Sequence, residues 1–135
     1  MARLAVAVVL FALTTLASAQ DLAKVSPNHA KVLKENSCVR VIENTLKPGE
    51  KDALHVHPAG WYYVTSPGTL KEIFSGNKVE MWEAKAGEAD WIDGEGPHTS
   101  ENVGKTPVTY VLVEIKGACK APPAAAPKPA PDKKK

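Results

Sequence analysis

The sequence has little of what builds a helical protein. From residue 20 onward, no segment repeats its apolar residues at the three- to four-residue spacing of an amphipathic helix. One short turn is expected at Ser26 to Ala30, where a capping residue precedes Pro27. There is also no internal repeat. A helical bundle and a repeat architecture are therefore excluded.

A concentrated basic surface is also missing from the central part of the chain. Residues 20–119 carry eleven basic and fourteen acidic side chains, a net charge of −3, although the whole chain has a formal charge of +2. A face that binds duplex nucleic acid is therefore excluded. The positive charge belongs to residues 118–135, which consist mainly of Pro, Ala and Lys. This composition predicts a solvated, disordered tail, with contact to anionic lipid or cell wall as the alternative.

Long apolar runs are absent outside the first 19 residues. There, Arg3 precedes an apolar run from Leu4 to Leu16, and Ala17-Ser18-Ala19 has the small-residue pattern of a cleavage site. This order predicts a secretory signal peptide over residues 1–19 and a mature chain that is not inserted in a membrane. An uncleaved anchor is the alternative, although the run is short for a spanning helix. Export to the periplasm or to the extracellular space is expected, and the sequence leaves both open.

The mature region contains a series of short β-prone segments separated by turn signals such as Pro48-Gly49 and Ser75-Gly76-Asn77. The segments are Lys31 to Glu35, Val39 to Leu46, Ala53 to His57, Trp61 to Thr65, Thr69 to Phe74, Lys78 to Glu83, Ala89 to Ile92, His98 to Asn102 and Pro107 to Lys116. This spacing predicts a single all-β domain, either a sandwich or a barrel. The Cys…Trp…Cys spacing of immunoglobulin domains is missing, which argues against that kind of sandwich.

Cysteine is scarce, with only Cys38 and Cys119 in the chain. An exported protein folds in an oxidising compartment, which permits a disulfide. Cys38 precedes the first long strand and Cys119 follows the last, so antiparallel pairing of these strands would bring the two residues to one edge. We predict a Cys38–Cys119 disulfide, and two free thiols are the alternative.

Histidine is also rare, but three of the four histidines form a pattern. His55 and His57 are separated by one residue in a predicted strand, so their side chains point to the same face. Two imidazoles on one face can chelate a divalent ion if another strand supplies a third ligand. His98 begins a later strand and is the candidate third ligand. Two polar residues on a solvated face are the alternative interpretation of the His55–His57 pair.

The surroundings of these histidines resemble the two motifs of the cupin superfamily. The first motif is matched by Gly49, His55-Val56-His57 and Gly68, and the second by Gly87, His98 and Asn102, all at the family's spacings. The resemblance implies a single-domain, jelly-roll β-barrel of the cupin type. We place the barrel at residues 38–117, preceded by an N-terminal arm with a short strand at residues 20–37.

The sequence departs from the motifs at three positions. Trp61 stands where the family has a glutamate ligand, Asp93 replaces a proline and Glu95 replaces a glycine. The resemblance therefore implies a metal site made of His55, His57 and His98 without the fourth carboxylate, unless Asp93 or Glu95 replaces it. Such a ligand set suits Fe, Zn, Ni, Cu or Co and does not distinguish among them.

Other residues are candidates for the site because of strand parity. Trp61 and Tyr63 share one face of their strand, so we expect both to line the pocket, with core packing as the alternative for Trp61. Asn102 lies four residues beyond His98 and should face inward, where it is expected to hydrogen-bond a ligand histidine. Tyr63 and Asn102 are therefore the candidate catalytic residues.

Together these features predict an exported, metal-binding cupin that acts on a small polar organic substrate. A metal-dependent enzyme of the dioxygenase type, or one resembling an isomerase or lyase, is the first hypothesis. A non-catalytic cupin of the cell envelope, binding a small ligand or serving a structural role, is the alternative. By resemblance to small cupins, a homodimer is also expected, with Lys31 to Glu35 as an edge strand that could pair.

Overall fold

The computed structural model describes residues 20–117, and these residues form nine strands and one short helix. The helix is α1 (Leu22–Val25), and the strands are β1 (Ala30–Glu35), β2 (Val39–Leu46), β3 (His55–His57), β4 (Gly60–Ser66), β5 (Gly68–Phe74), β6 (Val79–Ala84), β7 (Ala89–Ile92), β8 (Glu95–Asn102) and β9 (Val108–Ile115). The predicted all-β class is therefore confirmed. Among the described residues, no helix is both long and apolar enough to span a membrane.

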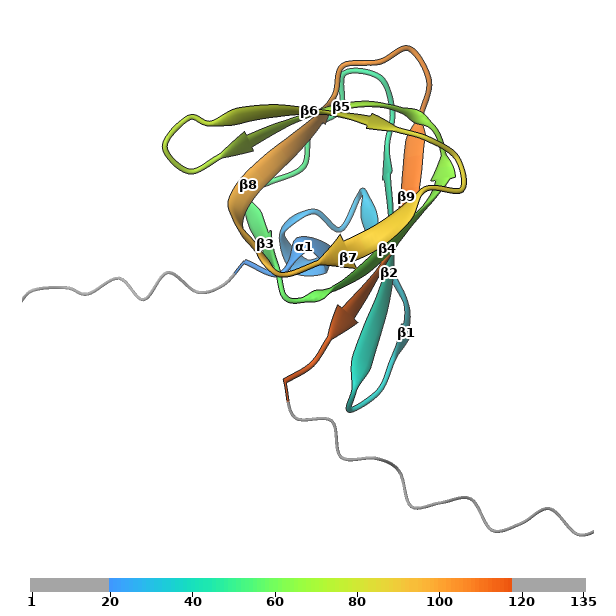
Figure 1. Cartoon of the computed structure of the whole chain (residues 1–135), viewed down its shortest axis with the longest axis vertical. Helices are drawn as coiled ribbons and strands as arrows, with labels where there is room; N and C mark the ends of the chain where they lie inside the picture. Colours follow the sequence, from blue (N-terminus) through green and yellow to red (C-terminus); the bar gives the residue numbers. More distant parts are fainter. Residues whose placement is uncertain (1–19, 118–135) are drawn as a thin grey trace, which may run out of the picture.

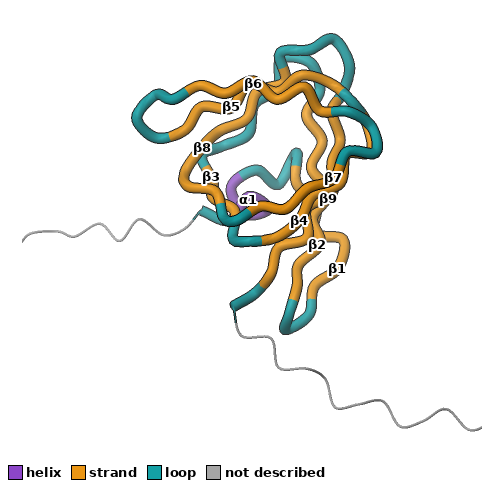
Figure 2. Tube along the Cα trace, viewed as in Figure 1, coloured by secondary structure: helices purple, strands orange, loops and turns teal. Residues whose placement is uncertain are grey.

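The strands form two antiparallel sheets that curve around a common interior (Figure 1). One sheet has five strands in the order β1-β2-β9-β4-β7, and the other has four in the order β3-β8-β5-β6. Figure 2 shows loops connecting the strands around the ring, and α1 with its adjoining loops lying beside the interior. The arrangement is the predicted jelly-roll barrel, with β1 at an edge of the five-stranded sheet. Dimerisation through β1 stays a prediction.

The apolar part of the interior follows the alternation of strand side chains. The apolar residues with no exposed surface are Leu22, Ile42, Leu46, Val64, Leu70 and Val108. Burying one such side chain contributes about 1.5–3 kcal/mol. Because Leu22 belongs to α1, the N-terminal arm is part of the core and not an appendage.

The N-terminal arm differs from expectation in one respect. The predicted turn at Ser26 is present, since the N–H groups of His29 and Ala30 donate to the Ser26 carbonyl at 3.0 and 2.9 Å. It is preceded by α1, which Asp21 caps by accepting a hydrogen bond from the Ala23 N–H at 3.1 Å. A four-residue helix is too short to show a helical period, so hydrophobic periodicity could not predict it.

Two glycines turn the chain into the segments that carry the histidines. Gly49 and Gly87 have φ values of +80° and +83°, a backbone conformation that side chains with a Cβ rarely adopt. Gly49 precedes β3, and Gly87 precedes β7 and β8. These two motif glycines therefore allow the tight turns after which the chain enters the strands of the barrel.

The predicted disulfide falls partly outside the described residues. Cys38 has no free thiol in the structure, whereas Cys119 lies beyond residue 117. The predicted signal peptide at residues 1–19 and the predicted tail at residues 118–135 lie outside the described range as well. The Cys38–Cys119 bridge, the signal peptide and the tail stay predictions.

The fold predicts a large stability loss for Asn102→Ala. The fully buried Asn102 amide donates to the carbonyls of Leu46 and Thr106 and accepts from the Gly104 N–H. Removing it leaves three backbone groups without partners, so we expect the free energy of unfolding to fall by about 2–4 kcal/mol. Urea denaturation measures this change. The neighbouring Glu101→Ala should change it by less than about 0.5 kcal/mol, and equal effects of the two substitutions would contradict the assignment.

Candidate metal centre

Strand pairing brings the three histidines together. β3 and β8 are antiparallel neighbours, and His55 lies directly opposite His98 in their register. His57 is two residues from His55 and points to the same side, as the alternation of strand side chains requires. All three side chains are buried, with 0% exposure for His55, 6% for His57 and 1% for His98. The potential ligand atoms of the three residues lie within 4.8 Å of one another.

Each imidazole is oriented by a hydrogen bond at its Nδ1 atom. Nδ1 of His55 lies 2.8 Å from the Ala53 carbonyl, and Nδ1 of His98 lies 2.9 Å from the Gly96 carbonyl. A carbonyl can only accept, so both Nδ1 atoms carry the proton. Nδ1 of His57 lies 3.4 Å from a carboxylate oxygen of Glu114 and donates to it in the same way. The three Nε2 atoms are left with free lone pairs.

These Nε2 lone pairs point toward one another inside the barrel. The Nε2 atoms of His55 and His57 are 3.1 Å apart, and neither ring has a proton there to share. Two imidazoles bound at about 2.1 Å to one ion at a right angle would have their nitrogens about 3 Å apart. The donor atoms present therefore fit a divalent transition ion, and the converging lone pairs are otherwise uncompensated.

Two of the histidines are held in the neutral form that metal binding requires. Burial, together with the neighbouring His57 and His98, lowers the pKa of His55 to about 3. Burial also lowers the pKa of His98. A neutral imidazole is the form that ligates a metal, so these two groups need not release a proton near pH 7.

A carboxylate and a guanidinium stand behind His57. Glu114, 9% exposed, accepts from His57 and lies 3.9 Å from a guanidinium nitrogen of Arg40. Arg40 in turn donates to Asp21 at 2.5 Å and to Glu35 at 3.2 Å. The chain Asp21–Arg40–Glu114–His57 thus connects the N-terminal arm to one of the three imidazoles.

Asp52 is a second buried carboxylate near the cluster. It is 3% exposed, accepts from the Ser100 N–H at 2.6 Å and lies 3.5 Å from Nδ1 of His55. Burial raises the pKa of Asp52 to about 6. The sequence analysis missed this residue because a single aspartate next to Lys51 has the appearance of a surface charge.

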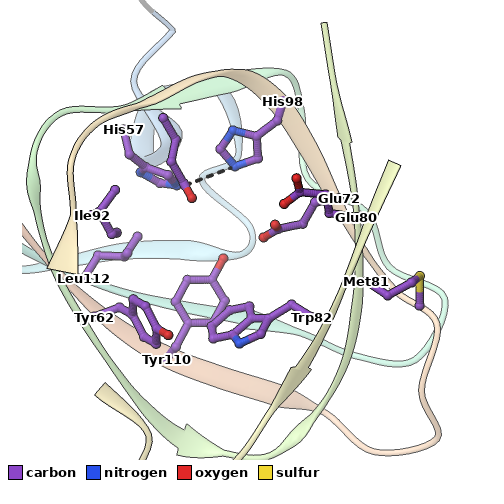
Figure 3. Close-up of a pocket in the computed structure, with 11 residues that line it drawn as sticks. His57, Tyr62, Glu72, Glu80, Met81, Trp82, Ile92, His98, Tyr110 and Leu112 are labelled. Carbon is purple, nitrogen blue, oxygen red and sulfur yellow. Dashed lines mark ion pairs between the residues drawn. The ribbon is translucent and has the colours of Figure 1, made fainter. Parts of the chain in front are cut away.

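A cavity of about 250 Å³ opens beside the histidines, and His57 and His98 form part of its wall (Figure 3). The other lining residues are Tyr62, Glu72, Glu80, Met81, Trp82, Ile92, Glu95, Tyr110 and Leu112. A small organic molecule in this cavity would therefore touch two of the three imidazoles.

Tyr110 presents a hydroxyl to this cavity. Its oxygen accepts a hydrogen bond from the buried Asn44 side chain at 2.8 Å, and the ring points its hydroxyl toward the histidines in Figure 3. Burial raises the pKa of Tyr110, so the phenol keeps its proton. Its O–H remains free to donate to a molecule in the cavity.

Glu72 is the acidic group in the cavity whose pKa is most altered. Burial, together with the nearby carboxylates of Glu95 and Glu80, raises the pKa of Glu72 to about 7. Glu72 was missed because it lies in a polar stretch of its strand that resembles a solvated face. A carboxyl group that titrates near neutral pH can both accept and release a proton.

The prediction that Trp61 and Tyr63 line the pocket is wrong. The inward side of β4 carries Gly60, Tyr62 and Val64, so Trp61 and Tyr63 stack on the outer face with ring centroids 6.1 Å apart. Tyr63 is 40% exposed. The two residues do share a face, as their parity predicted, but the cavity is on the other side and Tyr62 contributes to it. Tyr63 is therefore not a catalytic candidate.

Asn102 has a different role from the one expected. It faces inward with no exposed surface, as its parity with His98 predicts. Its amide, however, bonds only to backbone groups, and none of its hydrogen bonds reaches a histidine. It fixes the turn between β8 and β9 and is not a catalytic residue.

The two loop carboxylates considered as replacements for the missing ligand differ in position. Strand β8 begins at Glu95, earlier than the expected start at His98, and this brings a Glu95 oxygen to 3.8 Å from Nε2 of His98. Asp93 is exposed in the preceding loop. Glu95 is the carboxylate that could approach a metal on the histidines, whereas Asp93 lies away from them.

Several solved structures resemble this chain in fold. No protein-family model matches the sequence, and no curated protein matches it. Among solved structures, a cupin domain from Bordetella pertussis Tohama I has a TM-score of 0.60 and 21% identity, covering 65% of this chain and 92% of its own. An uncharacterised protein with a double-stranded β-helix domain from Klebsiella pneumoniae has a TM-score of 0.52 and 24% identity, covering 72% and 88%.

A third structure extends the comparison to more distant sequences. An RmlC-like cupin family protein from Methanocaldococcus jannaschii has a TM-score of 0.53 at 13% identity, covering 64% of this chain and 77% of its own. The architecture of the chain is thus a double-stranded β-helix. It has the cupin fold, as the two sequence motifs predicted.

The raised pKa of Glu72 generates a prediction about stability. Ionised Glu72 is disfavoured in the folded protein, so its contribution to the free energy of unfolding becomes less favourable as pH rises from about 4.5 through about 7. Without metal, Glu72→Gln should be more stable than the parent by about 1–3 kcal/mol near pH 8 and nearly equal to it near pH 4. Urea unfolding at both pH values measures the difference.

Glu83→Gln is the matched control for this prediction. Glu83 lies on β6, is exposed and accepts a hydrogen bond from Thr69. Its substitution should give a small difference that does not change with pH. A stability gain for Glu72→Gln that is equal at both pH values would show that Glu72 is not destabilised by its charge.

Proposed function

We propose that the protein is an exported, metal-dependent cupin enzyme that acts on a small polar organic molecule bound in the barrel cavity. One observation carries this proposal. Three Nε2 lone pairs converge beside the cavity, and hydrogen bonds at all three Nδ1 atoms fix them there. A site with only three protein ligands leaves coordination positions open, which is typical of catalytic and not structural metal sites.

His55, His57 and His98 would hold the metal. An ion on three imidazoles polarises an oxygen atom bound to it and, if it is a redox-active metal such as iron, also exchanges electrons. Glu114 and the two backbone carbonyls keep the imidazole planes in place, which preserves both the tautomer and the direction of each lone pair.

The cavity residues supply polar groups for a substrate. Tyr110 donates a hydrogen bond from an O–H that Asn44 already positions. Glu72 holds or takes up a proton close to neutral pH, which suits a general acid or base. Ile92 and Leu112 give the cavity an apolar wall, so water is displaced from part of the bound molecule.

The cellular location is part of the proposal. The basic residue, apolar run and small-residue site in residues 1–19 support cleavage of a signal peptide and export to the periplasm or the extracellular space. Mass spectrometry of the natural protein would then find a mature N-terminus at Gln20. A mature chain that keeps residues 1–19 would contradict export by this route.

Metal retention after loading tests the proposed metal site. Purified protein exposed to Zn²⁺ or Fe²⁺ and then desalted should retain about one ion per chain, measured by elemental analysis. His98→Ala removes one of three ligands and should retain less than about a tenth of that amount. Retained metal should also raise the melting temperature of the parent protein, because it binds the folded state.

His29→Ala is the matched control. His29 lies beside Glu50, at 3.5 Å, and is outside the cluster. This variant should load like the parent. Equal and low metal content in the parent and His98→Ala would overturn the proposed metal site. If the metal stabilises the fold but its spectrum does not change when azide is added, no coordination position is open. That result would support the structural alternative over the enzyme.

A further inference from the structure

Three aromatic rings form one corner of the cavity. Metal binding by the histidines does not require these rings. Trp82 lies nearly perpendicular to Tyr62, with ring centroids 5.1 Å apart and planes at 74°. It is also nearly perpendicular to Tyr110, at 5.5 Å and 67°. All three rings line the same cavity, opposite the histidines in Figure 3. Rings set at right angles around one space present their electron-rich faces from several directions.

The polar ends of two of these rings are turned away from the cavity. The Tyr62 hydroxyl and the Trp82 indole N–H both donate to the same oxygen of Glu88, at 2.9 and 3.1 Å. Glu88 is not among the cavity residues, and its other oxygen accepts from the Lys85 N–H at 3.0 Å. These bonds lower the pKa of Glu88, with the Trp82 bond contributing most. Glu88 thus fixes both rings from outside the cavity lining.

The charged residues of the cavity wall all have the same sign. Within residues 20–117, the cavity lining includes Glu72, Glu80 and Glu95 but no lysine or arginine. Lys78 pairs with Glu80, but its side chain is 69% exposed and does not line the cavity. Glu72 and Glu95, in contrast, have no lysine or arginine partner within residues 20–117, so a bound cation would meet uncompensated negative charge beside them.

Two of these carboxylates are direct cross-strand neighbours. Glu72 of β5 lies opposite Glu80 of β6, and both carboxylates appear on one side of the cavity in Figure 3. Like charges directly opposite one another destabilise a sheet. Lys78 offsets part of this repulsion at Glu80, and a bound cation beside Glu72 would reduce it further.

The wall opposite the aromatic corner has a buried nitrogen whose nearest charged neighbour is Glu95, at 3.8 Å. His98 is 1% exposed, and its Nε2 has no hydrogen-bond partner within the described residues. It is directed into the cavity in Figure 3. The cavity thus has nitrogen ligands at one end and aromatic rings at the other, with Glu72 and Glu80 on the side between them (Figure 3).

We propose that the cavity binds a small organic cation, an alkylated ammonium compound with an oxygen donor, whose cationic group lies against Trp82, Tyr62 and Glu72 and whose oxygen is directed to the histidines. This inference rests on the proposed function, since the metal on the histidines is what would receive the oxygen. Aromatic faces attract alkylated ammonium groups by cation–π interaction, and the effect is larger in a desolvated site. The carboxylates add a Coulombic attraction that a neutral molecule of the same shape does not receive.

The test compares choline with 3,3-dimethylbutan-1-ol, a neutral molecule of almost the same shape. Both are titrated into the full zinc-loaded protein near pH 8 by isothermal calorimetry, with the zinc content of each sample measured by elemental analysis. Choline should bind at least about tenfold more tightly than the alcohol. Equal affinities would overturn the inference.

Three substitutions identify the part of the cavity that recognises the cation. Glu72→Gln and Glu80→Gln keep the side-chain size and remove charge, so each should weaken choline by at least about fivefold and leave the alcohol unchanged. Glu88→Gln loosens the two rings from outside the cavity and should also reduce the preference for choline. Glu83→Gln, on the outer face of β6, should bind choline like the parent.

The zinc measurement separates the failure of this inference from failure of the proposed function. Full zinc loading with no preference for choline would overturn the cation site alone. Protein that retains no zinc would overturn the proposed metal site, and the choline preference of that sample would then test the aromatic and acidic wall by itself. If Glu72→Gln and Glu80→Gln weaken choline no more than Glu83→Gln does, the assigned wall is wrong.

Discussion

Three hydrogen bonds at imidazole Nδ1 atoms determine what the interior of this barrel can do. Buried histidines are costly unless their ring nitrogens are satisfied, and here one nitrogen of each ring is bonded to Ala53, Gly96 or Glu114. The second nitrogen then has only a lone pair, so it can accept a proton or bind a metal. Burial disfavours the proton, as the lowered pKa of His55 shows. The three Nε2 atoms could together hold a metal ion, as proposed above, and the cavity with Tyr110 and Glu72 lies beside them.

Local sequence rules predicted which residues share a face but not which face is the inside. The separation of His55 and His57 by one residue correctly placed them together, because strand side chains alternate. The same rule paired Trp61 with Tyr63, yet β4 turns Tyr62 toward the cavity and leaves the other two on the outer face, with Trp61 half-buried and Tyr63 exposed. Which side is buried depends on the sheet packed against the strand. The position of His98 opposite His55 also depends on long-range register, and only the resemblance to the cupin motifs indicated it before the structure did.

The residues that sequence reasoning missed are polar residues on the inner side of strands. Glu72, Glu80 and Trp82 lie in segments rich in charge, where hydrophobic alternation is weak. Such segments resemble solvated faces, since charged residues are seldom buried. Their exposure to a cavity becomes apparent only when β5 and β6 are placed in the four-stranded sheet. Glu95 was visible as a departure from the family motif, but its 3.8 Å approach to His98 follows from a strand that begins earlier than expected.

Arg40 connects two parts of the chain, because it lies between Asp21 of the N-terminal arm and the carboxylate that contacts His57. Arg40 has Asp21 and Glu35 as close partners and Glu114 at a longer distance. If residues near Gln20 are deleted or displaced by a fusion, the guanidinium loses its shortest contact and Glu114 becomes the nearest buried anion for it. A carboxylate drawn toward Arg40 is drawn away from His57, whose ring would then be free to rotate. The sequence immediately before the barrel is thus a poor place for tags or truncations, although it contributes no ligand.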